Sequence, residues 1–344
     1  MYKTDTFGGL VLLNNKCNNN CKYCYENNTG NEFVTTLQID KFINFLGRNG
    51  FNKHISFFGG EPSFSLPVIN DIMNKYKDIY TFSLTSNGFF IDRDDRDITV
   101  LRDMTNINIS IEGTQEAYEK LRGGKVNLKE LILKFYKKGF KNITFNISLN
   151  KYIFDNLDEL IDICEFIDKF NFKTHFYSIK SDYGFNLDDK YIKLVYDKLK
   201  DLKLINKEIF NSIIKFNKRN LEAELTDSNG VQFLCQFDNK IALSSDGMNL
   251  ITCAWNKSQS IGVLNETPDK DILDNFFTMI GLNHRSLFHC NECLVDTGYC
   301  SISCKYYLDD LITNNKLDEL NYNCKFQHML YNLYLDEVLE YCTQ

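Results

Sequence analysis

The residues with the clearest chemistry are three cysteines near the start of the chain, Cys17, Cys21 and Cys24. They follow the apolar run 10–13, which predicts a buried strand, so the spacing C-x3-C-x2-C places three thiols on the loop after it. A [4Fe–4S] cluster offers four irons to thiolate ligands. Three clustered thiolates would leave one iron open, whereas a structural zinc site closes all four positions. The loop therefore predicts an iron–sulfur cluster that keeps one iron for chemistry.

The segment around these cysteines belongs to a region that alternates strand-like and helix-like patterns from residue 9 to about residue 180. Such alternation predicts an α/β fold with a parallel sheet, because parallel neighbours need crossover connections. Spacing alone does not distinguish an open sheet from a partial barrel. The expected strands are Gly9–Leu13, His54–Phe58, Tyr80–Thr85, Ile107–Ile111, Asn142–Leu149 and Lys173–Ile179, and the expected helices span 36–47, 66–77, 93–103, 127–138 and 156–169.

A second motif, Gly59-Gly60-Glu61-Pro62, ends the second expected strand. Two glycines let the backbone approach a ligand closely, and a glutamate offers its carboxylate to an ammonium group. Taken alone, such a segment is usually only a turn. In a parallel sheet, however, it would lie at the same edge as the cysteine loop.

Composition limits the classes of function. The 344 residues carry a net charge of −7 without a block rich in Lys or Arg, so we expect no nucleic-acid partner. No apolar run approaches the roughly 18 residues of a membrane span, and residues 1–9 lack a secretory pattern, so we expect a cytoplasmic protein. Twelve cysteines in a reducing compartment indicate metal binding or catalysis rather than disulfides.

Together, the cysteine spacing, the aromatic Tyr23 before the third cysteine and the Gly-Gly-Glu-Pro motif resemble the signature of the radical S-adenosylmethionine (SAM) enzymes. The resemblance implies a partial (β/α)6 TIM-like barrel with its site at the carboxyl ends of the strands. It also implies that the open iron chelates SAM, whose reductive cleavage gives a 5′-deoxyadenosyl radical that removes a hydrogen atom from a C–H bond. Residues 59–62 would hold the amino group of SAM.

Three further strand ends resemble the family pattern. Ser86 and Asn87 resemble its ribose-side turn, although an Asn-Gly turn alone explains them equally well. Ser110 and Glu112 resemble the family's S-x-D-G motif, with Glu in place of Asp. Arg122 stands where relatives carry an arginine for the SAM carboxylate, a task that suits a planar guanidinium; a surface arginine is the alternative.

The C-terminal third contains a second set of cysteines around an expected β-hairpin, 240–244 and 250–253, with its turn at 246–247. The set resembles the SPASM extension, which binds two auxiliary [4Fe–4S] clusters, so that the resemblance implies three such clusters in all. Its crossed arrangement assigns Cys290, Cys293, Cys300 and Cys324 to one cluster and Cys235, Cys253 and Cys304 to the other.

The second auxiliary cluster is then one ligand short. Its fourth iron is open, or is held by substrate or by an oxygen ligand such as Asp227 or Asp238. Zinc is the alternative for this region, but seven thiolates do not divide into two complete zinc sites. Two cysteines are left over: Cys164 lies on the apolar face of an expected helix and predicts core packing, and Cys342 continues a similar stripe near the C-terminus.

These assignments divide the chain into three expected parts. Residues 1–182 form the barrel, 183–232 a helical bridge with helices at 188–202 and 207–225, and 233–344 an auxiliary-cluster domain with a C-terminal helix.

Radical SAM enzymes with this extension mostly modify peptides or proteins. The resemblance therefore implies a maturase of a ribosomally synthesised peptide that forms a thioether or carbon–carbon crosslink. Only 16 residues precede Cys17, so recognition of the precursor's leader is expected to fall to the barrel, the bridge or a separate leader-binding protein. A flavodoxin or ferredoxin would supply the electron.

Four alternatives stay open. A peptide epimerase would need a spare thiol, which only Cys164 or Cys342 could provide. A sulfatase-maturing enzyme, which makes formylglycine, usually carries Asp after the cysteine at the position of Cys253, where this chain has Ala254. A small-molecule dehydrogenase of the same superfamily is the third. A non-enzymatic iron–sulfur or zinc sensor is the fourth, and it leaves the Gly-Gly-Glu-Pro motif unexplained.

Overall fold

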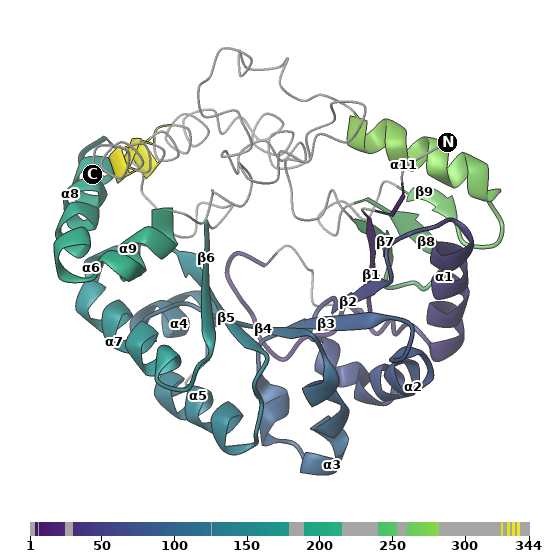
Figure 1. Cartoon of the computed structure of the whole chain (residues 1–344), viewed down its shortest axis with the longest axis horizontal. Helices are drawn as coiled ribbons and strands as arrows, with labels where there is room; N and C mark the ends of the chain where they lie inside the picture. Colours follow the sequence, from purple (N-terminus) through teal and green to yellow (C-terminus); the bar gives the residue numbers. More distant parts are fainter. Residues whose placement is uncertain are drawn as a thin grey trace.

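The computed structural model describes residues 4–5, 7–24, 30–124, 126–178, 189–214, 240–252 and 260–281, together with 325, 329–330, 332–333 and 336–337. Their centre is a curved nine-stranded sheet with helices along its convex side (Figure 1). The strands are β1 (Gly8–Leu12), β2 (His54–Phe58), β3 (Thr81–Ser86), β4 (Asn106–Ile111), β5 (Ile143–Leu149), β6 (Lys173–Ser178), β7 (Lys240–Leu243), β8 (Asn249–Ile251) and β9 (Ser260–Val263).

The sheet has the order β6-β5-β4-β3-β2-β1-β7-β8-β9, and every pair from β6 to β7 is parallel. β6 and β9 are its two outer strands, so the sheet does not close into a full barrel. This confirms the α/β class and the partial barrel. All seven parallel strands end at one edge, so the loops after β1, β2, β3 and β4 meet there.

The helices that cover the sheet match most of the expected segments. Amphipathic periodicity explains their positions, since residues such as Phe42, Ile69, Phe135 and Ile163 come from different helices and join one apolar core. The predicted helices correspond to α1 (Thr36–Arg48), α2 (Leu66–Tyr76), α5 (Leu128–Lys137) and α7 (Leu157–Asp168), and α7 is preceded by the short α6 (Lys151–Asp155). Cys164 of α7 is 5% exposed within this core, as its periodicity predicts.

The structure differs from the prediction in two details here. The helical stretch expected at 93–103 is present but divided into α3 (Asp95–Ile98) and η3 (Thr99–Asp103), and a separate turn, η2 (Phe89–Asp92), precedes it. The Asp94 side chain accepts from the backbone N–H of Arg96, so a new helix begins there instead of continuing. The second is an omission: α4 (Gln115–Arg122) follows β4, where no helix was expected.

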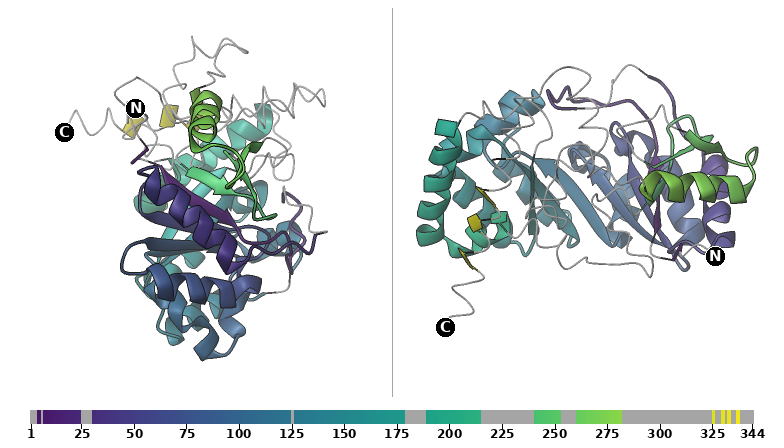
Figure 2. Two further views of the ribbon diagram at one scale, coloured as in Figure 1. Left: turned by 90° about the vertical axis from the view of Figure 1, so that its right-hand side faces the viewer. Right: turned by 90° about the horizontal axis from the view of Figure 1, so that it is seen from above.

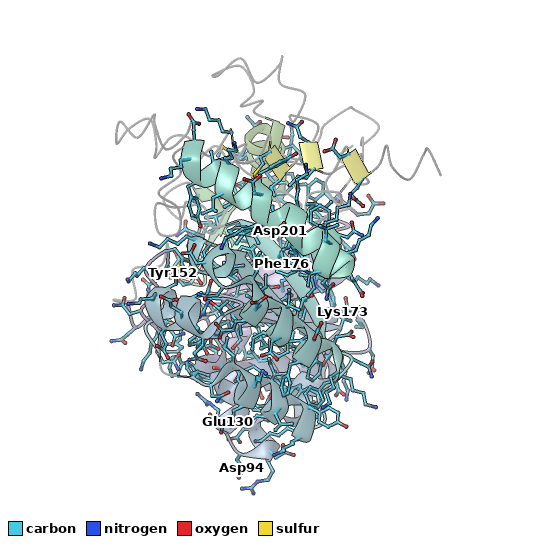
Figure 3. All side chains as sticks on the ribbon, turned by 90° about the vertical axis from the view of Figure 1, so that its left-hand side faces the viewer. Asp94, Glu130, Tyr152, Lys173, Phe176 and Asp201 are labelled. Atoms are coloured by element: carbon cyan, nitrogen blue, oxygen red, sulfur yellow. The ribbon has the colours of Figure 1, made fainter. Side chains whose placement is uncertain are left out.

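The two bridge helices are α8 (Asp189–Ile205) and α9 (Lys207–Ile214), so the first continues past its expected end at residue 202. They pack near β6 on the side of the molecule shown in Figure 3, where Asp201 of α8 and Glu130 of α5 are labelled with Phe176 of β6 between them. Glu337 joins this side, because its carboxylate pairs with Lys203 and Lys207. None of the described helices is long and apolar enough to cross a bilayer.

The expected C-terminal hairpin is present as β7 and β8, but it does not stand apart from the barrel. β7 pairs in parallel with β1, with Leu10 opposite Ala242, so the hairpin extends the sheet (Figure 1). α11 (Asp269–Gly281) lies beside this end of the sheet and is held to α1 by the ion pair between Arg48 and Asp269 (2.5 Å) (Figure 2). Both expected boundaries, near residues 182 and 232, lie outside the described residues.

The two faces of the sheet differ in polarity. Alternate residues such as Phe57, Phe82 and Ile109 face the helices and are fully buried or nearly so. The residues between them face the concave side and are mostly Ser, Thr and Asn, as the strand sequences HISFF, TFSLTS and NINISI show. The concave face is therefore polar, apart from a small apolar patch of Leu10, Leu12, Ala242 and Ile251 on β1, β7 and β8, against which Phe58 of β2 packs.

Candidate functional site

The cysteine loop crosses the carboxyl ends of the strands and is held there by its backbone. Leu13 N–H donates to the Phe58 carbonyl (2.8 Å), which prolongs the pairing of β1 and β2. Asn14 continues this connection, since its carbonyl accepts from Gly60 N–H (2.8 Å) and its side chain donates to the Glu61 carbonyl (3.2 Å). The start of the loop is thus fixed to the Gly-Gly-Glu-Pro segment.

The two glycines of that segment were expected to let the backbone approach a ligand, but in the structure they lie against the cysteine loop. A Cβ atom on Gly59 would lie 2.4 Å from the Asn14 carbonyl oxygen, and one on Gly60 would lie 2.3 Å from the Lys16 carbonyl oxygen. Gly59 also has φ +134°, which disfavours other residues. The close approach that requires glycine is therefore made by the cysteine loop, whose backbone leaves no space for a side chain.

The Glu61 side chain is buried (1% exposed) and already carries three hydrogen bonds. Its carboxylate accepts from Ser63 N–H (3.0 Å), Ser86 Oγ (2.7 Å) and Asn87 N–H (2.8 Å). It therefore connects the ends of β2 and β3. Pro62 follows as the first residue of η1 (Pro62–Ser65), and it is buried too.

The turn after β3 contacts the cysteine loop directly. The Asn87 side chain donates to Asn18 Oδ1 (2.7 Å), one residue after Cys17, and its own Oδ1 accepts from Phe89 N–H (3.1 Å). Ser86 Oγ accepts from Gly88 N–H (3.0 Å). Both residues are nearly fully buried, so the Asn-Gly turn and the predicted ribose-side position are parts of one constrained structure.

A buried polar group lies at the far end of the cysteine loop. The Tyr23 hydroxyl donates to Glu112 Oε1, and Arg122 Nη1 lies within hydrogen-bond distance of both Tyr23 (2.9 Å) and Glu112 (3.2 Å). Glu112 is 0% and Arg122 7% exposed, so their ion pair is shielded from solvent. Lys22 N–H donates to the Leu121 carbonyl (2.8 Å), which adds a backbone contact beside it.

This group retains unused hydrogen-bonding atoms. Glu112 Oε2 and Arg122 Nε are buried and have no hydrogen-bond partner among the described residues. Such atoms are costly unless a ligand or water satisfies them. The unpaired Nε of Arg122 therefore fits the carboxylate of SAM that the resemblance assigns to Arg122. Ser110 lies two residues before Glu112, half-buried on the concave face of β4.

The three cysteines are close enough to affect one another's protonation. Burial raises the pKa of the Cys21 thiol to about 11, and the Arg122 charge opposes this while the Cys24 and Cys17 charges reinforce it. Burial likewise raises the pKa of Cys17, against a hydrogen bond from Asn19 N–H (3.4 Å). Cys24 is exposed. The Cys17 and Cys21 thiols are therefore protonated at neutral pH, and cluster binding must release these protons.

The fit to a cluster rests on this donor set. Within the described residues, no three Cys, His, Asp or Glu side chains have the arrangement that holds a metal ion. Three thiols on one loop, none of them fully buried, nevertheless match the three-thiolate requirement of an open cluster. Cys17, Cys21 and Cys24 are thus brought into one loop, whose side chains must rearrange when a cluster binds.

All seven cysteines assigned to auxiliary clusters lie outside the described residues, as do Asp227, Asp238 and Cys342. Their assignment stays a prediction. Two positioning residues were not expected from the sequence, Asn14 and Asn18 of the cysteine loop. The only sequence signal for these two was the Asn-rich composition around Cys17, which is typical of turns. Tyr177 of β6 lies near this group, since burial and the Glu112 charge raise its pKa.

The model of the Radical SAM superfamily matches residues 11–167, so this part of the chain is similar to that superfamily. Among curated relatives, a probable GTP 3′,8-cyclase of Pyrococcus horikoshii is 24% identical over 77% of this chain and 90% of its own length. The radical SAM cyclopropyl synthase TigE of Paramaledivibacter caminithermalis is also 24% identical, over 86% of this chain and 66% of its own.

Two solved structures share the fold. Native anSMEcpe with bound AdoMet superposes with a TM-score of 0.69 at 17% identity, covering 98% of this chain and 99% of its own. Streptococcus suis SuiB bound to the precursor peptide SuiA gives a TM-score of 0.60 at 16% identity, covering 89% of this chain and 72% of its own. At these identities the similarity concerns the fold.

Proposed function

We propose, on the premise of the similarity of residues 11–167 to the Radical SAM superfamily, that this protein matures a ribosomally synthesised peptide by forming a thioether or carbon–carbon crosslink. When bound, the cluster and SAM supply a radical that removes a hydrogen atom from an unactivated C–H bond. The chain's own residues place and shield that chemistry. Cys17, Cys21 and Cys24 would hold the cluster, and residues 59–62 with Arg122 would hold the methionine part of SAM.

The observation that supports a peptide as the substrate is the chemistry of the concave face of the sheet. No acidic residue occurs in any of the seven parallel strands, and His54 is the only ionisable side chain in β2–β5. The face instead presents hydroxyl and amide groups that already bond to one another, as in Ser56···Ser83 (3.0 Å) and Thr144 to Asn106 (2.8 Å). A peptide backbone offers uncharged donors and acceptors of the same kind.

The sequence similarity to a GTP cyclase favours a second candidate, a cyclisation of a nucleoside triphosphate. A triphosphate requires several Arg or Lys side chains at its phosphates. The strands that line the described concave face contain no arginine and only two lysines, Lys173 and Lys240, on strands at opposite ends of the parallel set. The polarity of the face therefore favours the peptide.

Crosslink formation removes two hydrogens from the peptide, so its electrons must be accounted for. One hydrogen leaves as an atom to the deoxyadenosyl radical, and the other leaves as a proton and an electron. Two auxiliary [4Fe–4S] clusters on the seven C-terminal cysteines would accept that electron, while a flavodoxin or ferredoxin supplies the electron that cleaves SAM. The peptide's leader would bind to the barrel, to the helical bridge or to a separate leader-binding protein.

The first experiment is to reconstitute the protein without oxygen and to measure iron and sulfide beside a Cys17→Ala/Cys21→Ala/Cys24→Ala variant. About twelve irons, falling to about eight in the variant, support three clusters at four irons each. About four irons plus zinc contradict the auxiliary clusters.

The substrate is tested next with the reduced protein and SAM. A Cys- or aromatic-rich peptide encoded beside the gene should lose two hydrogens by mass spectrometry and raise 5′-deoxyadenosine output, whereas GTP should do neither. A D-residue would instead indicate an epimerase, and formylglycine a sulfatase-maturing activity. If the reduced protein does not cleave SAM at all, it is a sensor and not an enzyme.

A further inference from the structure

The resemblance places Glu112 among the SAM-binding residues, but in the structure its side chain bonds to Tyr23 and Arg122. It follows β4 directly, is 0% exposed, and its Oε1 contacts both Tyr23 and Arg122. We propose that Glu112 is a positioning residue, which fixes the cysteine loop to the end of α4 through Tyr23 and aligns Arg122. This inference rests on the proposed radical SAM function but does not depend on the substrate.

The first support is the place of Tyr23 in the chain. It stands between Cys21 and Cys24, so the direction of its side chain limits where the backbone can place both thiols. Its hydroxyl ends in the buried Glu112–Arg122 pair, so rotation of Tyr23 would break a hydrogen bond inside the protein. Glu112 can thus hold the cluster ligands without contacting them.

The second support is that two neighbouring loop residues each contact the end of α4. Lys22 N–H bonds to the Leu121 carbonyl, and the Tyr23 hydroxyl bonds to the group that contains Arg122. Loop residues 22–23 are therefore attached to helix residues 121–122 by both backbone and side chain. Arg122 Nη1 is occupied by this contact while its Nε has no partner among the described residues, so Glu112 also determines which edge of the guanidinium remains for a ligand.

Shortening the Glu112 side chain tests whether its reach to Tyr23 matters or only its charge. Aspartate keeps the charge that neutralises buried Arg122 but withdraws the carboxylate by about one C–C bond, roughly 1.5 Å. A role that needs only the charge tolerates Glu112→Asp, whereas a role in holding Tyr23 does not.

The experiment compares Glu112→Asp, Glu112→Gln, Tyr23→Phe and the double variant Glu112→Gln/Tyr23→Phe with the wild type. The matched control is Glu159→Gln, since Glu159 accepts from Gln115 N–H (2.9 Å) at the other end of α4 and has no hydrogen bond to the described loop residues 17–24. The readouts are the release of SAM-site iron to a chelator without SAM, the thermal midpoint, and kcat and KM for SAM cleavage without peptide. SAM-site iron is the iron that the triple cysteine variant lacks.

We expect Glu112→Asp and Tyr23→Phe each to speed iron release about tenfold, as changes to residues that orient metal ligands commonly do. KM for SAM should rise more than kcat falls, the double variant should release iron no faster than the faster single variant, and Glu159→Gln should match the wild type.

Three results would overturn the proposal: iron release unchanged in Glu112→Asp, rate effects that multiply in the double variant, or an equal effect of Glu159→Gln. Should Glu112→Gln fail to fold, Tyr23→Phe still decides, because it leaves the Glu112–Arg122 ion pair in place. No readout uses a peptide, so a protein that modifies none would disprove the proposed function and leave this inference standing.

Discussion

A single residue, Gly60, leaves the space that the backbone of the cysteine loop occupies. Gly60→Ala would place Cβ 2.3 Å from the Lys16 carbonyl oxygen, and the backbone of the loop would have to move. We expect this variant to lose most of the SAM-site iron. Gly139→Ala is the control: Gly139 has φ +74° but nothing within 4 Å, so it should cost about 1 kcal/mol of stability and keep its iron. Equal iron in both variants would contradict this reading.

Glu61 leads to a second prediction about one residue. Removing its carboxylate in Glu61→Ala leaves the Ser63 and Asn87 N–H groups and the Ser86 hydroxyl without their buried acceptor. At about 1 kcal/mol or more for each donor, unfolding of the variant should be easier by about 3 kcal/mol or more. Denaturant titration checks this against the exposed Glu130→Gln, which should stay within about 0.5 kcal/mol of the wild type. A loss as small as that of Glu130→Gln would show that Glu61 does not connect the two strand ends.

At the scale of two neighbouring strands, we predict from His54 that the stability of the folded protein depends on pH. His54 begins β2 and contacts Thr81 (2.8 Å) and Ser83 (3.0 Å) of β3, while Lys240 of β7 bonds to neighbouring Ser56 (2.9 Å). Burial, and then the Lys240 charge, lower the pKa of His54 to about 4. Between pH 6.5 and 4 the unfolded chain therefore binds more protons than the folded one, and stability falls as the pH falls through this window.

The size of this effect is about 2 kcal/mol, after an allowance for the partial exposure of His54. Thermal midpoints measured from pH 7 to pH 4.5 should fall less in His54→Gln than in the wild type. Parallel curves for the two proteins would mean that His54 does not carry the dependence.

The elements also show where sequence patterns suffice. Strands such as His54–Phe58 and helices such as α5 were predictable because their burial follows a simple period, and an apolar stripe has one favourable orientation on a sheet. α4 was missed because only Ala117, Tyr118 and Leu121 of its eight residues are apolar, and its end is fixed by the cysteine loop. The partners of Glu61 and Glu112 come from 2 to 89 positions away, and no local pattern encodes those contacts.

At the scale of the whole molecule, β1 is an inner strand only because β7 covers its second side. A chain cut after residue 214 would expose the backbone of β1 and the apolar patch of Leu10 and Leu12. We expect that truncation to aggregate on size exclusion and to exchange its β1 amides rapidly. A chain cut after residue 281 keeps β7–β9 and α11 and should retain slow exchange in β1. Slow exchange in both would mean that residues 1–214 fold without the C-terminal part.

The pairing of β1 with β7 also determines when β1 can be completed as an inner strand during translation. The two strands are separated by more than 200 residues, so β1 leaves the ribosome long before its second neighbour exists. At about 5–20 residues per second, this delay is on the order of ten to fifty seconds. Throughout it, the loop with Cys17, Cys21 and Cys24 is attached to a strand with one open side. Iron supplied in this interval would meet ligands on an incompletely paired strand, so we expect cluster insertion to follow the synthesis of β7.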